Sequence, residues 1–166
     1  SDNVSFSLAS SGSAGTFSRT AYIWFKDAAG NVSGNSSAAI NLVITDTTAP
    51  ASPSISINSG ADNTTFTNVT LTISATDALG VRGYYASESS TAPANNASGW
   101  TSVTSSTNYS DNVSFTLTSA QTSGEISRVV YVWFKDGSGN VSSSSSDTIT
   151  LRSLVATQIS AGLEHT

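Results

Sequence analysis

Four aspartates stand beside turn-forming residues, where their carboxylates could bind a metal ion: Asp46, Asp77, Asp111 and Asp136. Carboxylate oxygens are ligands that calcium prefers in proteins, so calcium is the cofactor that these residues suggest. The alternative is that Asp77 and Asp136 each cap their own turn and that Asp46 only begins a linker. Turns use aspartate in this way very often, and we therefore favour the reading without a cofactor.

The chain lacks the residues that a catalytic site would combine. It has no cysteine, and its single histidine, His165, follows Glu164 close to the carboxyl end. The many serines have no neighbouring base that could activate them as nucleophiles. We therefore expect a protein that is not an enzyme, with His165 in a structural role.

Two tryptophans, Trp24 and Trp133, occupy the same place in a repeated motif. The alternation of the motif places both side chains on the face opposite the core. Outward aromatic rings can stack on a sugar, because they offer flat apolar area with little conformational entropy to lose. More often such rings pack across strands or cover the stems of lysines.

The pattern N-x-[ST], which marks acceptors for N-linked glycans, recurs along the chain. The candidates are Asn31, Asn63, Asn96 and Asn140, and the pattern is also met at Asn3, Asn35, Asn68, Asn108 and Asn112. Composition explains part of this abundance, because the chain is rich in serine and threonine.

The composition excludes some partners and favours an external location. With 6 Lys and Arg and a net charge of -5, the chain lacks the basic face that nucleic acids require. No apolar run is long enough to span a bilayer. A surface of hydroxyls and amides with few charges is typical of secreted or cell-surface repeat proteins, and we expect an extracellular or cell-surface location.

The segment "YIWFKDAAGNVS" at 22–33 returns as "YVWFKDGSGNVS" at 131–142, with a constant offset of about 109 residues. The repeat predicts three parts of the chain. Residues 1–48 correspond to the carboxyl-terminal half of one unit, 49–152 to a complete unit, and 153–166 to a tail. The opening residues begin in mid-pattern, and we expect a fragment of a longer protein.

Within the complete unit, apolar residues alternate with serine and threonine, which is typical of strands with one buried face. In the repeated motif, this alternation predicts Val130, Val132 and Phe134 in the core. Turn-forming clusters separate seven predicted strands, at 54–58, 69–76, 81–87, 100–104, 113–118, 128–135 and 141–151. This pattern predicts an all-β protein made of tandem immunoglobulin-like (fibronectin III-like) antiparallel β-sandwiches.

In such a sandwich, the entering linker, two of the loops and the last hairpin share one end of the unit. Asp46, Asp77, Asp111 and Asp136 lie in those four segments. They could therefore converge at the junction between the two units, where calcium would neutralise their charges and raise the melting temperature.

"DTTAP" followed by "VTLTISATDALGV", "GYYASESS", "GWTSV" and "YVWFKDGSGNVS" resembles the bacterial immunoglobulin-like repeats of large secreted and cell-surface proteins. The resemblance implies a spacer or adhesive module whose partners are neighbouring repeats, with calcium at some junctions. The tail departs from it, because "ATQISAGLEHT" is similar to the first strand of an RCC1-like β-propeller repeat.

Two functions from different classes follow. The first is a non-catalytic spacer and interaction segment of an extracellular repeat protein or surface filament. The second is a carbohydrate-binding accessory module of an extracellular enzyme, which would use exposed aromatic rings to bind a surface glycan.

The incomplete first unit should leave Phe6, Leu8, Ile23 and Phe25 facing water. The preceding residues of a longer parent would cover this face, which is the explanation that we favour. Alternatively, another copy of the chain would cover it by strand addition and form a polymer.

Overall fold

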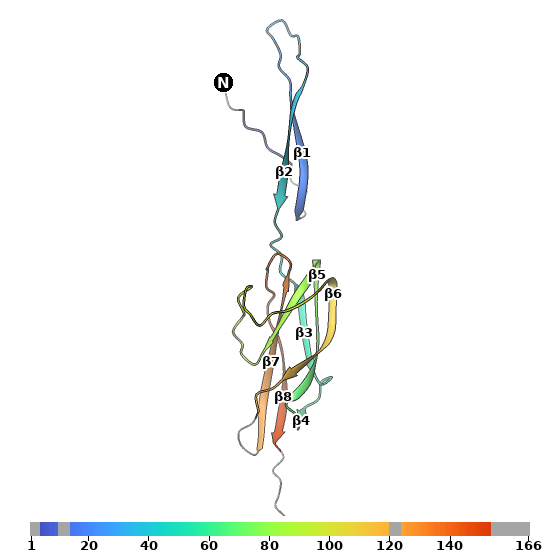
Figure 1. Ribbon diagram of the computed structural model, residues 1–166, viewed down its shortest axis with the longest axis vertical. Helices are drawn as coiled ribbons and strands as arrows, with labels where there is room; N and C mark the ends of the chain where they lie inside the picture. Colours follow the sequence, from blue (N-terminus) through green and yellow to red (C-terminus); the bar gives the residue numbers. More distant parts are fainter. Residues whose placement is uncertain (1–3, 10–13, 120–123, 154–166) are drawn as a thin grey trace, which may run out of the picture. The chain divides into compact units, whose positions relative to one another are not determined.

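The computed structural model describes residues 4–9, 14–119 and 124–153, and these residues form strands and no helix (Figure 1). The prediction of an all-β chain is therefore confirmed. Since the described residues contain no helix, none of them forms an apolar helix long enough to cross a membrane. The chain divides into two compact units, Ser1–Thr47 and Thr48–Thr166.

The first unit is built on an antiparallel hairpin of β1 (Gly15–Ile23) and β2 (Ser36–Ile44). Residues 4–9 have no strand structure, although the repeat aligns them with the predicted strand at 113–118. As predicted, apolar side chains of this unit face solvent: Phe6 is 71%, Ile23 44% and Phe25 66% exposed. Leu8 is half-buried.

The second unit contains one six-stranded sheet in the order β3-β5-β7-β8-β4, with β6 also paired to β5. Its strands are β3 (Ala51–Ile57), β4 (Asn63–Thr64), β5 (Asn68–Ser87), β6 (Thr101–Thr116), β7 (Gly124–Asp136) and β8 (Ser145–Ser153). Neighbouring strands are antiparallel, except that the short β4 runs parallel to β8. The expectation of a purely antiparallel unit is therefore wrong at β4.

Two pairs of predicted strands are each a single strand. The segments 69–76 and 81–87 are joined in β5, and 100–104 and 113–118 are joined in β6. The cluster "DALG" does not end the strand, because β6 pairs with β5 on both sides of it. The predicted last strand starts later than expected, at Ser145, since Val141 makes only an isolated bridge to Lys135.

β5 changes partners at a corner formed by Asp77 and Gly80. Before the corner β5 pairs with β3, and after it with β7. The Oδ1 atom of Asp77 accepts hydrogen bonds from the backbone N–H groups of Leu79 (2.9 Å) and Gly80 (2.8 Å). Gly80 has φ of 101°, a conformation that residues with a Cβ rarely adopt. The sequence thus places a turn inside the strand without ending it.

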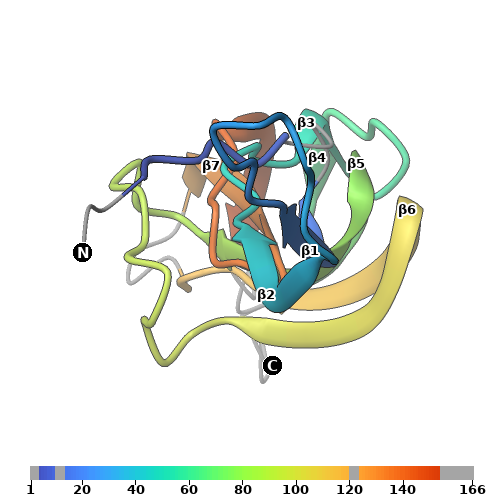
Figure 2. The ribbon, with the colours of Figure 1, turned by 90° about the horizontal axis from the view of Figure 1, so that it is seen from above.

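The sheet curls around its own core (Figure 2), so that β3 contacts β7 and β8 although it pairs with neither. A hydrogen bond links β3 to β8 on this side of the core: the backbone N–H of Ile57 donates to Asp147 Oδ2 at 2.7 Å. Val130, Val132 and Phe134 are fully buried, which confirms the predicted core face of the motif. They pack with apolar residues of the other strands, among them Ile57, Leu71, Ile73, Val81 and Ile149.

We expect Gly80→Ala to destabilise the second unit by about 1–3 kcal/mol, because alanine is strained at this φ. An added Cβ would also lie 2.1 Å from Ser105 Oγ and 3.3 Å from the Ser106 nitrogen. Urea denaturation of the full chain measures the change in the free energy of unfolding.

Gly137→Ala is the matched control, because its Cβ would meet only the Arg82 side chain, at ordinary contact distances of 3.6 Å to Cγ and 3.8 Å to Nε. Combining Gly80→Ala with Ser105→Ala separates the hydroxyl clash from the backbone strain. Equal effects of the two glycine substitutions would contradict the role of the corner.

Candidate functional site

The repeated motif closes a hairpin whose polar groups bond to one another. In the second unit, Asp136 is 3% exposed, and its Oδ1 accepts the N–H groups of Ser138 (2.8 Å) and Asn140 (2.9 Å). Its Oδ2 accepts a hydrogen bond from Asn140 Nδ2 at 2.7 Å. Asp136 therefore caps the turn that follows β7.

The first unit contains the same hairpin cap. Asp27 Oδ1 accepts the N–H of Asn31 at 2.8 Å, and Asp27 Oδ2 accepts Asn31 Nδ2 at 2.8 Å. These hydrogen bonds, the side-chain bond from Asn31 first among them, lower the pKa of Asp27 below its usual value of 3.8. The cap forms although Asp27 is exposed to solvent.

A serine completes each hairpin in the same way. Ser142 Oγ accepts the N–H of Phe134 at 2.9 Å, and Ser33 Oγ accepts the N–H of Phe25 at 2.9 Å. Each hydroxyl donates to a carbonyl of the following residue, Ser143 or Gly34. The aspartate, asparagine and serine that the two copies of the motif share are thus occupied in holding the hairpin.

Three of the four predicted metal ligands make separate local hydrogen bonds. Asp77 caps the corner of β5 and Asp136 its hairpin, whereas Asp111 is exposed and its Oδ1 accepts the N–H of Asn112 at 2.8 Å. Asp46 belongs to the first unit. Within 4–9, 14–119 and 124–153, no three His, Cys, Asp or Glu side chains are grouped so as to hold a metal ion.

Trp133 lies on the face of β7 opposite the core, as the alternation predicted, but it is only 2% exposed. Its ring meets Tyr85 edge-on at 6.2 Å and stacks on Tyr131 at 6.0 Å, both between ring centroids. Trp100 in turn meets Tyr85 edge-on at 5.7 Å. These rings form an aromatic cluster on the outer face of β5 and β7, and Trp133 offers no accessible surface to a ligand.

The segment that leads from β5 to β6, residues 88–100, is held against this cluster by side-chain contacts. The Lys135 ammonium lies 4.7 Å from the centre of the Trp100 ring and donates to the Asn95 carbonyl at 3.0 Å. Trp100 Nε1 donates to the Ala94 carbonyl at 2.8 Å. A cation over an aromatic face is stabilising, so Lys135 joins β7 to this segment.

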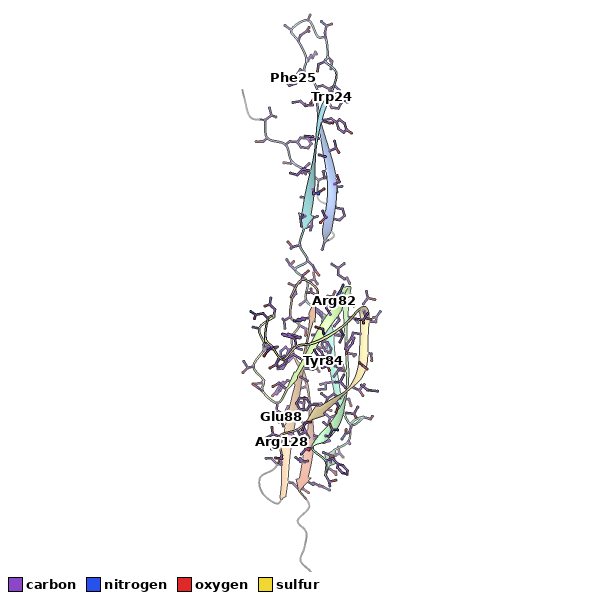
Figure 3. The ribbon with its side chains drawn as sticks, in the orientation of Figure 1. Trp24, Phe25, Arg82, Tyr84, Glu88 and Arg128 are labelled. Atoms are coloured by element: carbon purple, nitrogen blue, oxygen red, sulfur yellow. The ribbon has the colours of Figure 1, made fainter. Side chains whose placement is uncertain are left out.

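A second set of contacts holds the start of the same segment, where Glu88 and Arg128 lie side by side (Figure 3). Glu88 Oε2 accepts two hydrogen bonds from Thr118, one from its backbone N–H at 2.9 Å and one from its side-chain hydroxyl. Glu88 Oε1 forms an ion pair with Arg128, 3.7 Å from its Nε. Sequence reasoning missed both residues. Arg128 had a signal, since Arg19 occupies the same place in the first unit, but Glu88 had none.

Trp24 has a different environment from its equivalent in the second unit. It stacks on Tyr22 with ring centroids 6.0 Å apart, and both side chains are 55% exposed. Figure 3 labels Trp24 and Phe25 beyond the end of β1. The first unit therefore presents the accessible aromatic rings that the second unit covers.

The glycan acceptor candidates also differ in their surroundings. Asn63 and Asn96 are exposed. The side-chain nitrogens of Asn31 and Asn140 instead donate to Asp27 and Asp136 within the hairpin caps. A glycan on either cap residue would replace one of the two hydrogens of that nitrogen, so only the remaining N–H could keep the hydrogen bond to the aspartate.

Tyr109 is a buried ionisable group of the core. Burial, with a further contribution from the nearby Asp111 carboxylate, raises the pKa of Tyr109 to about 12. Tyr109 thus keeps its proton at neutral pH, stacks on Tyr84 and meets the ring of Phe134 edge-on. His165 lies outside the described residues.

Comparison of the chain with protein-family models, with curated proteins and with solved structures found no match in any of the three.

The two tryptophans should differ sharply in their contribution to stability. We expect Trp133→Ala to cost about 3–5 kcal/mol, as for a large side chain removed from a packed site. Trp24→Ala should cost less than about 0.5 kcal/mol, as for an exposed residue. Urea denaturation of the full chain measures both.

If Trp133→Ala does not fold, Trp133→Phe with acrylamide quenching of the remaining tryptophans gives the same comparison. Trp24→Phe should remove the most quenchable emission and Trp133→Phe the least quenchable. Equal quenching of the two residues would contradict the difference in burial.

The hairpin cap of the first unit should depend on pH. Because the folded-state pKa of Asp27 is lowered, its stabilising effect is present above the unfolded pKa and is lost as the pH falls through the folded value. An NMR titration of the Asn31 backbone amide should therefore show a midpoint below 3.8. Asp27→Asn should abolish the transition, and a midpoint at or above 3.8 would contradict the cap.

Proposed function

We propose that this chain is a non-catalytic structural and adhesive segment of a large extracellular repeat protein, in which immunoglobulin-like sandwich units in tandem act as spacers. Its partners are neighbouring units of the same kind. The proposal is supported by the strand arrangement, by the chemistry of the repeated motif and by the composition.

The strand arrangement of the second unit supports a two-layer sandwich. One layer would contain β3, the first half of β5 and the second half of β6, and the other the second half of β5, β7 and β8. The corner at Asp77 and Gly80 carries β5 from one layer to the other. Contacts between β3 and β8, which are not paired, fit packing across such a sandwich.

The observation that carries the proposal is the use of the repeated polar residues. Asp27 and Asn31 bond to each other, and so do Asp136 and Asn140, while each motif serine bonds to its own hairpin. The aspartate, asparagine and serine that recur in both copies of the motif therefore hold a hairpin. A protein built from repeated structural units in this way acts as an extended spacer that presents a binding surface to its partners.

The composition supports an extracellular or cell-surface location. The chain has no cysteine and no methionine, so it lacks the side chains that oxidise most readily. Charged residues make up 10% of it, and the exposed positions of the strands are mostly serine and threonine. Such a surface does not depend on ion pairs that salt would screen.

A carbohydrate-binding module is the second candidate, and one observation favours it. The stacked pair of Tyr22 and Trp24 is exposed on the first unit, and a flat aromatic pair suits a sugar ring. The equivalent pair in the second unit, Tyr131 and Trp133, belongs to the aromatic cluster and is covered. We therefore place this function second.

A spacer should resist extension. When the full chain is stretched between its ends, we expect one cooperative unfolding event, from the second unit, that lengthens the chain by roughly 300–350 Å. Val132→Ala, which opens a cavity beside Phe134, should lower the unfolding force, whereas Thr148→Ala at an exposed position should not.

Titration with soluble polysaccharides discriminates between the two candidate functions. The spacer proposal predicts no saturable binding. Binding that is lost in Trp24→Ala and kept in Ser18→Ala would instead support the carbohydrate-binding module and count against a purely structural role.

A further inference from the structure

The hairpins β1–β2 and β7–β8 have the same register, and yet their apolar faces differ in burial. Gly15 pairs with Ile44 and Ile23 with Ser36, just as their equivalents pair in the second unit. Val132 and Phe134 are fully buried, whereas the equivalent Ile23 and Phe25 are 44% and 66% exposed. The same hairpin is therefore covered in one unit and uncovered in the other.

The second unit shows which segment provides the cover. The second half of β5 pairs with the free edge of β7, with Tyr84 opposite Phe134, Tyr85 opposite Trp133 and Ala86 opposite Val132. On the core side, Tyr84 and Ala86 pack against the buried cluster. On the outer side, Tyr85 covers Trp133.

The first unit offers a matching edge and face. Its described residues form a two-stranded sheet, so β1 pairs with β2 alone. β1 ends at Ile23, whereas β7 continues to Asp136, because only β7 has β5 beside it. A groove of about 310 Å³, whose apolar lining includes Val4, Phe6 and Ile23, lies on this hairpin.

We propose that the edge of β1 and the apolar face of the first unit bind an added polypeptide strand with the alternating pattern of β5. The partner is the amino-terminal half of a repeat unit of this kind, on a polypeptide segment that is not part of this chain. It should align antiparallel, with the equivalents of Tyr84, Tyr85 and Ala86 opposite Phe25, Trp24 and Ile23. Main-chain hydrogen bonds along the edge and alternate side chains in the groove would provide the affinity.

The test is the addition to the full chain of a synthetic peptide with the sequence of residues 68–92. The chain's own copy of this segment is occupied within the second unit, so the peptide is directed to the first. We expect saturable binding by calorimetry, slower hydrogen exchange of the amides at 22–27, and less quenching of Trp24 by acrylamide. A peptide of the same composition in scrambled order should do none of these.

Ile23→Asp should weaken binding at least about tenfold, because it places an unpaired charge in the apolar interface. Ser18→Asp is the matched control on the opposite face of β1 and should bind as the parent chain does. Equal loss in both variants, or equal binding of the scrambled peptide, would overturn the proposal. So would concentration-dependent dimerisation that protects 22–27 without peptide, since it would assign the face to a second copy.

Discussion

In the second unit, β5 is hydrogen-bonded to β3, β6 and β7. β3 pairs with β5 before the corner at Asp77 and Gly80, and β7 pairs with it after the corner, so the backbone turns between these two partners. Two N–H groups freed at the corner are satisfied by the Asp77 carboxylate, and the positive φ falls on a glycine. The curled sheet and the enclosed core both follow from this corner.

The hairpin that ends each unit depends much less on the rest of the molecule. In both copies an aspartate, an asparagine and a serine satisfy the turn, with nearly the same hydrogen-bond lengths. The copy in the first unit keeps this geometry although its apolar face is exposed. Local hydrogen bonds therefore specify the hairpin, and burial adds stability to a geometry that already exists.

The candidate site shows where sequence reasoning succeeds and where it ends. Turn caps at Asp77 and Asp136 could be foreseen, because each bonds only to residues within four positions of itself. The burial of Trp133 could not be foreseen, because its cover comes from Tyr85 and from the segment held by Glu88 and Lys135. Those contacts join residues 30 to 48 positions apart, and a local sequence pattern does not predict them.

The amino-acid sequence alone predicts the all-β class, the strand and hairpin of the repeated motif, and the apolar face of Val132 and Phe134. The tertiary structure joined 69–76 and 81–87 into one strand, since this depends on the pairing of β6 with both segments. It also decided that Phe134 is buried while Phe25 is exposed. Alternation determines which side chains share a face of a strand, but that face is buried only when a segment distant in the sequence packs against it.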